Sequence, residues 1–160
     1  MKIREATQND YNEVWEIFYL VIKNGDVFVF DPKTPKEDMV KYWLSPDMHT
    51  FVLEENGEIL GSYFLKANQV DLGSHIANGG YMTHPNALGK GIAKMMCEHS
   101  LQKAKELGFQ AMQFNMVVST NKAAIKIWKN YGFKTIGIIP KAFNHIKLGL
   151  QDALIMYREL

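Results

Sequence analysis

A glycine-rich turn between a strand-like run and a long amphipathic segment constrains this chain more than any other feature. The turn reads Gly89-Lys90-Gly91-Ile92-Ala93, follows a run that ends at His84-Pro85, and opens a helix expected over residues 89–107. Glycine lets the backbone approach an anion that a side chain would block. The N–H groups and dipole at a helix N-terminus favour negative charge. We therefore expect a phosphate-bearing ligand near Gly89.

Composition bounds the class of protein. A chain of 160 residues, 47% of them hydrophobic, suggests one globular domain over residues 1–160. The net charge of +1 and the presence of only two arginines, Arg4 and Arg158, give no case for nucleic acid or a membrane surface. One cysteine, Cys97, cannot form an internal disulfide, and no apolar run reaches the roughly 20 residues of a membrane span. The first residues have no apolar signal core, so the expected location is cytoplasmic.

Apolar periodicity predicts a mixed α/β chain with both hairpin and crossover connections. Asn56-Gly57 between two strand-like runs is a strong hairpin signal. Thr34-Pro35 with Glu37 resembles a capped helix start. The expected helices cover about 9–23, 34–45, 89–107 and 121–130, and the expected strands cover 3–6, 50–54, 58–66, 74–83, 111–118, 134–139 and 153–160.

The expected core follows the same periodicity. In the long third helix a stripe from Ile92 to Leu107 is apolar or small, and Gly108 ends the helix. The pair Met95-Met96 is also expected in the core. Other expected core residues are Trp15, Phe18, Trp43 and Tyr131. The segment between the last two strands, with Pro140, Phe143, His145 and Gly149, is expected to be a loop.

Two phosphate-binding motifs do not fit the glycine turn. A P-loop needs a glycine where this chain has His84 and a serine or threonine where it has Gly91. A dinucleotide fingerprint needs a third glycine where this chain has Lys94.

The turn resembles instead the acyl-CoA pyrophosphate loop of the GNAT N-acetyltransferases, whose pattern is Q/R-x-x-G-x-G/A. Gly91 and Ala93 match this pattern, and Leu88 departs from it at the first position. Downstream, residues 121–133 resemble the family's N-x-x-A-x-x-L-Y-x-x-x-G-F run. The matching positions of that run are Asn121, Ala124, Gly132 and Phe133.

This resemblance implies a mixed sheet of about seven strands, with a splay between two central strands and about four flanking helices. It implies an acetyl-CoA-dependent N-acetyltransferase whose pantetheine arm lies along Tyr81 to Thr83. The residues that the resemblance assigns to acetyl-CoA are Met82, Thr83, Leu88, Gly89, Lys90, Gly91, Ile92, Ala93, Asn121 and Ala124.

Segments 108–115, 118–121 and 140–145 resemble a narrower branch that includes fungal acetyltransferases of proline analogues such as azetidine-2-carboxylate. This favours a small amino-acid-like amine as the acceptor. A protein amine as acceptor and a non-catalytic acyl-CoA-binding module on the same fold stay open as alternatives. A nucleotide-binding protein is a weaker third alternative. Late strands often mediate dimers in this family, so a homodimer is also open.

Acetyl transfer needs a neutral amine, stabilisation of an oxyanion and release of a thiolate. Many relatives carry a tyrosine acid where this chain has Trp128, and an indole N–H is no practical acid. We therefore expect no tyrosine acid there, with Trp128 packing near the acetyl group. Asn115, late in the strand beside the splay, is expected to orient the amine or polarise the carbonyl, against the alternative of a buried structural amide.

No general base stands out in the sequence. The candidates are His75, Tyr81, His84, His145 and Glu16, each of which reads as structural or exposed, and a water chain is an alternative. Asp26 and Asp31 could meet an acceptor amine. The run Cys97-Glu98-His99 cannot form a catalytic triad, because adjacent helical residues point in different directions. No histidine or cysteine has metal-ligand spacing, so no metal is expected.

Overall fold

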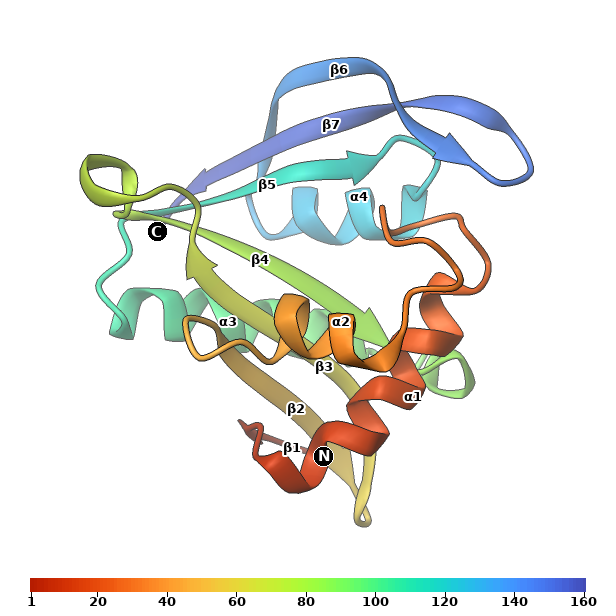
Figure 1. The fold of residues 1–160 in the computed structure, drawn as a ribbon. Helices are drawn as coiled ribbons and strands as arrows, with labels where there is room; N and C mark the ends of the chain where they lie inside the picture. The colour runs from red at the N-terminus through yellow and green to blue at the C-terminus, as the bar shows by residue number, and fades with distance from the viewer.

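The computed structural model describes residues 1–160 and forms one seven-stranded sheet in the order β1-β2-β3-β4-β5-β7-β6 (Figure 1). The strands are β1 (Lys2–Glu5), β2 (His49–Glu55), β3 (Glu58–Ala67), β4 (Ile76–Thr83), β5 (Ala111–Val118), β6 (Lys134–His145) and β7 (Gly149–Glu159). The helices are α1 (Tyr11–Ile22), α2 (Lys36–Trp43), α3 (Ile92–Glu106) and α4 (Lys122–Asn130). The order of helices and strands is the predicted one, and the α/β class is confirmed.

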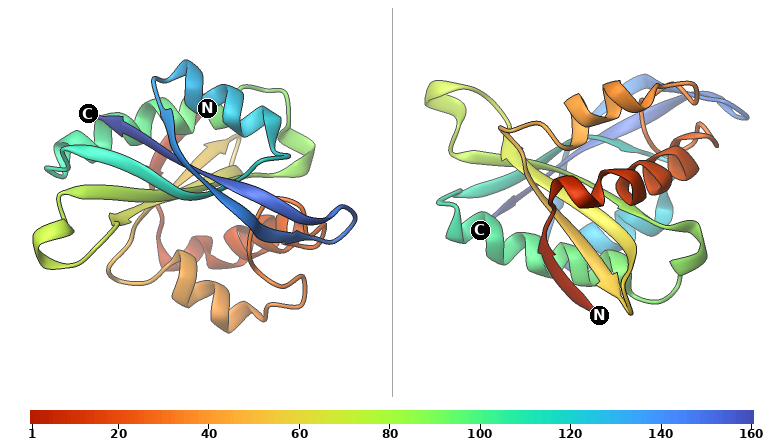
Figure 2. Two further views of the ribbon diagram at one scale, coloured as in Figure 1. Left: turned by 90° about the horizontal axis from the view of Figure 1, so that it is seen from above. Right: turned by 60° about the horizontal axis from the view of Figure 1, so that its bottom comes forward.

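The helices cover both faces of the sheet (Figure 2). On one face α1 and α2 pack on β2 to β4 around a core that includes Phe18, Trp43 and Phe64. On the other face α3 and α4 pack around a second core that includes Met96, Met112 and Trp128. The alternation of side chains along each strand assigns its residues to one core or the other.

The predicted splay lies between β4 and β5. These strands pair in parallel only at Ile76–Ala111 and Ala77–Met112, and beyond these pairs they diverge (Figure 1). At the point of divergence the Asn78 side-chain amide donates a 2.9 Å hydrogen bond to the backbone oxygen of Gln113. A side chain thus bridges the strands where the backbone ladder ends.

The predicted hairpin between β2 and β3 is confirmed. Asn56 and Gly57 both have positive φ, 53° and 84°. Positive φ at both central residues is the signature of a two-residue type I′ turn, whose twist matches that of the flanking strands.

The start of α3 differs from the prediction. The helix begins at Ile92 and not at Gly89, because Gly89 and Gly91 adopt left-handed φ angles of 81° and 80°. Its core stripe ends at Ala104, while Leu107 is 40% exposed and Met95 is 36% exposed. The turn of α3 after Ala104 no longer faces the sheet.

The start of α2 also differs, whereas α1 has Asp10 at its N-cap position, as predicted. The Thr34 hydroxyl donates to the backbone oxygen of Asp31 and does not cap α2, whose N-cap position is Pro35. Before α1 a short 3₁₀ turn spans Gln8–Asp10. Asp10 accepts hydrogen bonds from Thr7 in this turn. Local hydrogen bonds of short polar side chains compete here with helix capping.

The expected loop between the last strands is wrong. β6 continues to His145 and pairs with β7 from Gly149 onward, across a bulge in which Lys141 has φ 52° and its N–H donates to Asp152 Oδ1. His145 is buried rather than on the surface, and its Nδ1 accepts hydrogen bonds from the backbone N–H groups of Lys147 and Leu148. Pro140 had suggested the end of a strand, but an edge strand tolerates proline at a bulge.

No helix of the chain has the length and apolarity that crossing a bilayer requires.

A charged network fixes β1 to the start of α1. Arg4 donates to both carboxylate oxygens of Asp10 at 2.8 Å and to Glu54 at 2.8 Å. The Arg4 hydrogen bonds lower the pKa of the buried Asp10 carboxyl to about 2.

We predict that Asp10→Asn lowers the free energy of unfolding at pH 7 by about 2 kcal/mol. Because the pKa of Asp10 is depressed in the folded chain, its contribution is present above its unfolded value of about 4 and is lost as the pH falls toward 2. Urea unfolding between pH 7 and pH 2.5 measures the difference in free energy of unfolding between the wild type and Asp10→Asn, which should shrink as the pH falls. The control is Asp38→Asn in the exposed pair with Lys41, where solvent screening leaves a much smaller expected loss. Equal losses in the two variants would contradict the assignment.

Candidate active site

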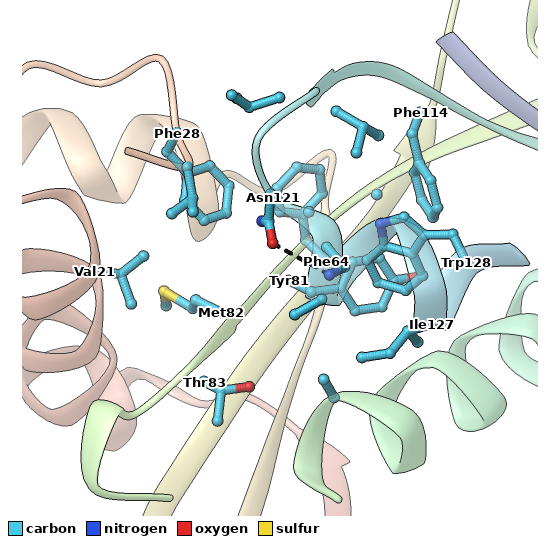
Figure 3. A pocket seen from close by; sticks show the side chains of 18 of the residues that line it. Val21, Phe28, Phe64, Tyr81, Met82, Thr83, Phe114, Asn121, Ile127 and Trp128 are labelled. Atoms are coloured by element: carbon cyan, nitrogen blue, oxygen red, sulfur yellow. Dashed lines mark hydrogen bonds between the residues drawn. The ribbon is translucent and has the colours of Figure 1, made fainter. Parts of the chain in front are cut away.

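A cavity of about 840 Å³ passes through the splayed part of the sheet (Figure 3). Its lining comes from both faces: the segment after α1 and residues of α2 on one side, and the N-terminal parts of α3 and α4 on the other. Between them lie β4 from Asn78 to Thr83 and β5 from Phe114 to Val118. Because β4 and β5 are separated there, one ligand can reach both faces.

The α3 end of the cavity presents free backbone donors. The N–H groups of Gly89, Gly91, Ile92, Ala93 and Lys94 have no hydrogen-bond partner in the chain. A Cβ added at Gly89 or Gly91 would meet nothing within 4 Å, so the space beside this turn is open. Orphan donors and the positive end of the helix dipole together form a cradle for an anion such as a diphosphate.

Nearly all residues that the sequence assigns to acetyl-CoA line this cavity. The exception is Lys90, which is exposed and outside the lining. Asn121 caps α4, because its side-chain oxygen accepts from the Ala124 N–H at 3.2 Å, and it also faces the cavity (Figure 3). Those that line the cavity are Met82, Thr83, Leu88, Gly89, Gly91, Ile92, Ala93, Asn121 and Ala124.

An aromatic cluster forms the middle of the cavity wall. Trp128 packs against Tyr81 and Phe114, each with ring centroids 4.8 Å away (Figure 3). Its indole N–H makes no hydrogen bond in the chain. Every fully buried side-chain nitrogen has a hydrogen-bond partner, so this nitrogen is not fully buried. The N–H of Trp128 is therefore partly exposed, and because Trp128 lines the cavity this group is available as a donor.

Tyr81 does not offer its hydroxyl to the cavity. Ser100 donates to the Cys97 backbone oxygen at 2.7 Å, so Tyr81 donates to the Ser100 hydroxyl, also at 2.7 Å. Burial raises the pKa of Tyr81 far above its ordinary value. A phenol held in this way is unsuited to proton transfer at neutral pH.

Asn115 lines the cavity but is exposed, which rules out the buried structural amide considered from the sequence. Its side chain donates to Asn68 Oδ1 at 2.7 Å and accepts from Gln113 Nε2 at 2.9 Å. These bonds hold the amide across the mouth of the splay.

The other base candidates lie outside the cavity. His75, His84, His145 and Glu16 do not line it, and Asp31 faces its own turn, accepting from the Lys33 N–H. Asp26 is the only acid in the lining.

The side chains of Cys97, Glu98 and His99 lie in different surroundings, as expected for adjacent residues of a helix. Burial raises the pKa of the Cys97 thiol to about 12, and Glu98 is exposed. The His99 ring is hydrogen-bonded to the Tyr63 hydroxyl at 2.6 Å. None of these three residues lines the cavity.

The far end of the cavity, toward α1 and α2, has an aromatic wall that the sequence did not reveal. Trp43 is fixed by donation from its indole N–H to the Ser62 hydroxyl at 2.9 Å. Its ring meets Phe64 edge-on at 4.9 Å and Phe28 at 5.8 Å. Gly80 must lack a side chain here, because a Cβ would lie 2.6 Å from the Phe64 ring. Alternation on β3 could have indicated Phe64, whereas Phe28 follows no periodic pattern.

Comparison with known proteins leads independently to the family that the sequence motifs resemble. The model of the acetyltransferase (GNAT) family matches residues 5–133. N-acetyltransferase aca1 of Schizosaccharomyces pombe is 34% identical over 98 residues, which is 61% of this chain and 47% of aca1. This chain thus spans about half the length of that relative.

Two solved structures share the whole fold. A GCN5-related N-acetyltransferase from Kribbella flavida has a TM-score of 0.94 at 31% identity, over 99% of this chain and 97% of that one. The protein yncA from Salmonella typhimurium, solved with its cofactor acetyl-CoA, has a TM-score of 0.88 at 21% identity, over 100% and 94%. By its family match and by its likeness to the Kribbella protein, this chain belongs to the GNAT acetyltransferase family.

Proposed function

We propose that this chain, as one domain over residues 1–160, transfers the acetyl group of acetyl-CoA to a small amino-acid-like amine. The observation that carries the proposal is the set of free N–H groups at Gly89 and at Gly91 to Lys94, at one end of a cavity that passes through the sheet. The diphosphate of the cosubstrate would lie on these donors. The pantetheine arm would follow β4 at Met82 and Thr83, whose edge facing β5 meets no strand.

The bound cosubstrate supplies a thioester carbonyl and a thiolate leaving group. The chain's own residues orient the reactants around it. Trp128 packs at the middle of the cavity, where its free N–H can donate a hydrogen bond, and Asn115 offers an amide to the incoming amine. Since a thiol has a pKa near 8.5, a thiolate can leave without a tyrosine acid.

The amine must lose a proton before it attacks. The cavity contains no histidine, and Asp26 is its only carboxylate, so Asp26 or solvent would accept that proton. The α-amine of a peptide N-terminus, with a pKa near 8, is partly neutral at pH 7, whereas a lysine-like amine near 10.4 is almost wholly charged. The more basic the acceptor amine is, the more its attack depends on this proton acceptor.

Two finer proposals accompany this function. A cytoplasmic location is supported by the single buried thiol, Cys97. A homodimer through β6 is supported by Ile136 and Ile138 on this edge strand, which are 58% and 62% exposed.

Turnover distinguishes the enzyme from a non-catalytic acyl-CoA-binding module. We predict that release of CoA from acetyl-CoA, corrected for hydrolysis, rises with members of a panel of free amino acids and other amines, and that mass spectrometry finds the acetylated product. Release that stays flat across the whole panel, with CoA still bound, would favour the binding module. Acetylation of peptide amines alone would favour a protein acceptor.

We predict that Gly91→Asp weakens CoA binding at least about tenfold more than Gly91→Asn does, because only aspartate adds negative charge beside the diphosphate. Both variants carry the cost of a side chain at φ 80°. Gly57→Asp, at φ 84° in the β2–β3 turn, is the control for that cost and should leave binding unchanged. Calorimetric titration with CoA measures the wild type and the three variants. Equal affinities of the two Gly91 variants would refute the diphosphate site.

We predict that Asn115→Ala lowers kcat about tenfold or more and leaves the affinity for CoA within about twofold. The amide lies on the acceptor side of the cavity, away from the α3 donors. The matched control is Asn68→Ala, which removes the Asn115 partner while keeping the Asn115 side chain. Steady-state kinetics measure kcat, and titration with CoA measures the affinity. A wild-type kcat in Asn115→Ala would leave this residue a purely structural role.

A further inference from the structure

Lys66 lines the end of the cavity beside α1 and α2, which is the end proposed for the acceptor. It follows Phe64 by two residues on β3, so both side chains are on the α1 and α2 face of the sheet. In the register of β3 with β4 it stands opposite Asn78. Directly opposed residues have Cβ atoms about 5 Å apart, so Lys66 and Asn78 can contact the same small group.

The Lys66 ammonium is not used by the fold. It takes part in none of the four ion pairs of the chain, which involve Arg4, Lys41 and Lys103. Its stem is half-buried and its side chain lines the cavity. Its charge contributes weakly to lowering the pKa of Asp47, whose main cause is a hydrogen bond from Ser45, and Asp47 is fully exposed and outside the cavity.

The polar groups beside Lys66 on the sheet are amides; the acid whose pKa its charge affects, Asp47, is exposed and outside the cavity, and the one acid of the lining is Asp26. Asn78 donates to the Gln113 backbone oxygen, and the Asn68 and Asn115 amides are bonded to one another. The wall above is aromatic, with Phe30 and Tyr42 rings 5.2 Å apart beside Trp43. The only other lysine in the lining, Lys94, is in the first turn of α3 at the opposite end.

A lone ammonium among amides and aromatic rings selects the charge of a ligand. A carboxylate that leaves water for this pocket needs a charged partner. Lys66 provides the charge, and Asn78 lies beside it. A polyamine would bring a second ammonium against Lys66 without a neutralising acid on that strand. A peptide N-terminus has an amide where a free amino acid has its carboxylate, so it gains nothing from the lysine.

We propose that Lys66 binds the carboxylate of the acceptor, and hence that the acceptor is a free amino acid with an apolar side chain. This inference rests on the proposed acetyl transfer to an amine. It makes Lys66 a residue that determines acceptor specificity, and it gives the aromatic wall the role of holding the apolar side chain.

The test compares an amino acid acetylated by the wild-type enzyme with its carboxamide, in the wild type, Lys66→Met and Lys66→Arg. We expect Lys66→Met to raise KM for the amino acid about 10- to 100-fold. KM for the carboxamide and for acetyl-CoA should stay within about twofold. Lys66→Arg should recover part of the loss, because it restores the charge. Lys33→Met, on an exposed lysine outside the cavity, is the control and should resemble the wild type.

Other outcomes separate this inference from the function beneath it. Equal losses for the acid and its carboxamide, or no loss in Lys66→Met, would overturn the role of Lys66 while acetyl transfer stands. A wild-type enzyme that acetylates carboxamides or polyamines in preference to free acids would also overturn it. If nothing in the panel is acetylated, calorimetry with the CoA complex and the same acids decides: binding lost in Lys66→Met supports the carboxylate site, and absence of wild-type binding overturns it.

Discussion

The parting of β4 from β5 is the constraint on which the rest of this structure depends. Two parallel pairs hold the strands together, and the Asn78 amide makes one last bridge before they separate. Backbone groups in the separated stretch would be costly to leave without partners, so this stretch must face solvent or a ligand. The opening joins two environments that a continuous sheet would keep apart: the free donors at the start of α3 and the aromatic wall beside α1 and α2.

The two ends of the cavity are lined by different kinds of group. At the α3 end the binding groups are backbone N–H donors, set by the left-handed conformations of Gly89 and Gly91, and their strength depends little on side-chain identity. At the other end the groups are side chains, and Lys66 is the single cation there. Under the proposed function, the first end would hold the diphosphate of the cosubstrate and the second would hold the acceptor.

The sequence predicted the parts of the fold that depend on local chemistry. Asn56-Gly57 indicated the hairpin, Gly108 indicated the end of α3, and the glycine turn indicated a helix start with free backbone donors. It failed where structure depends on distant partners. The bulge in β6 is held by Asp152 on β7, and the burial of His145 depends on the hairpin tip, neither of which leaves a local pattern. The aromatic wall of the cavity was missed for the same reason, since Phe28, Trp43 and Lys66 are distant in the sequence and line the same cavity only in the folded chain.

A crystal structure of this protein with coenzyme A tests the central claim most directly. The account predicts diphosphate oxygens about 3 Å from the backbone nitrogens between Gly89 and Lys94, with the pantetheine arm between β4 and β5 and its thiol near Trp128. A diphosphate bound away from the start of α3, or an arm that does not enter the gap between the two strands, would contradict it.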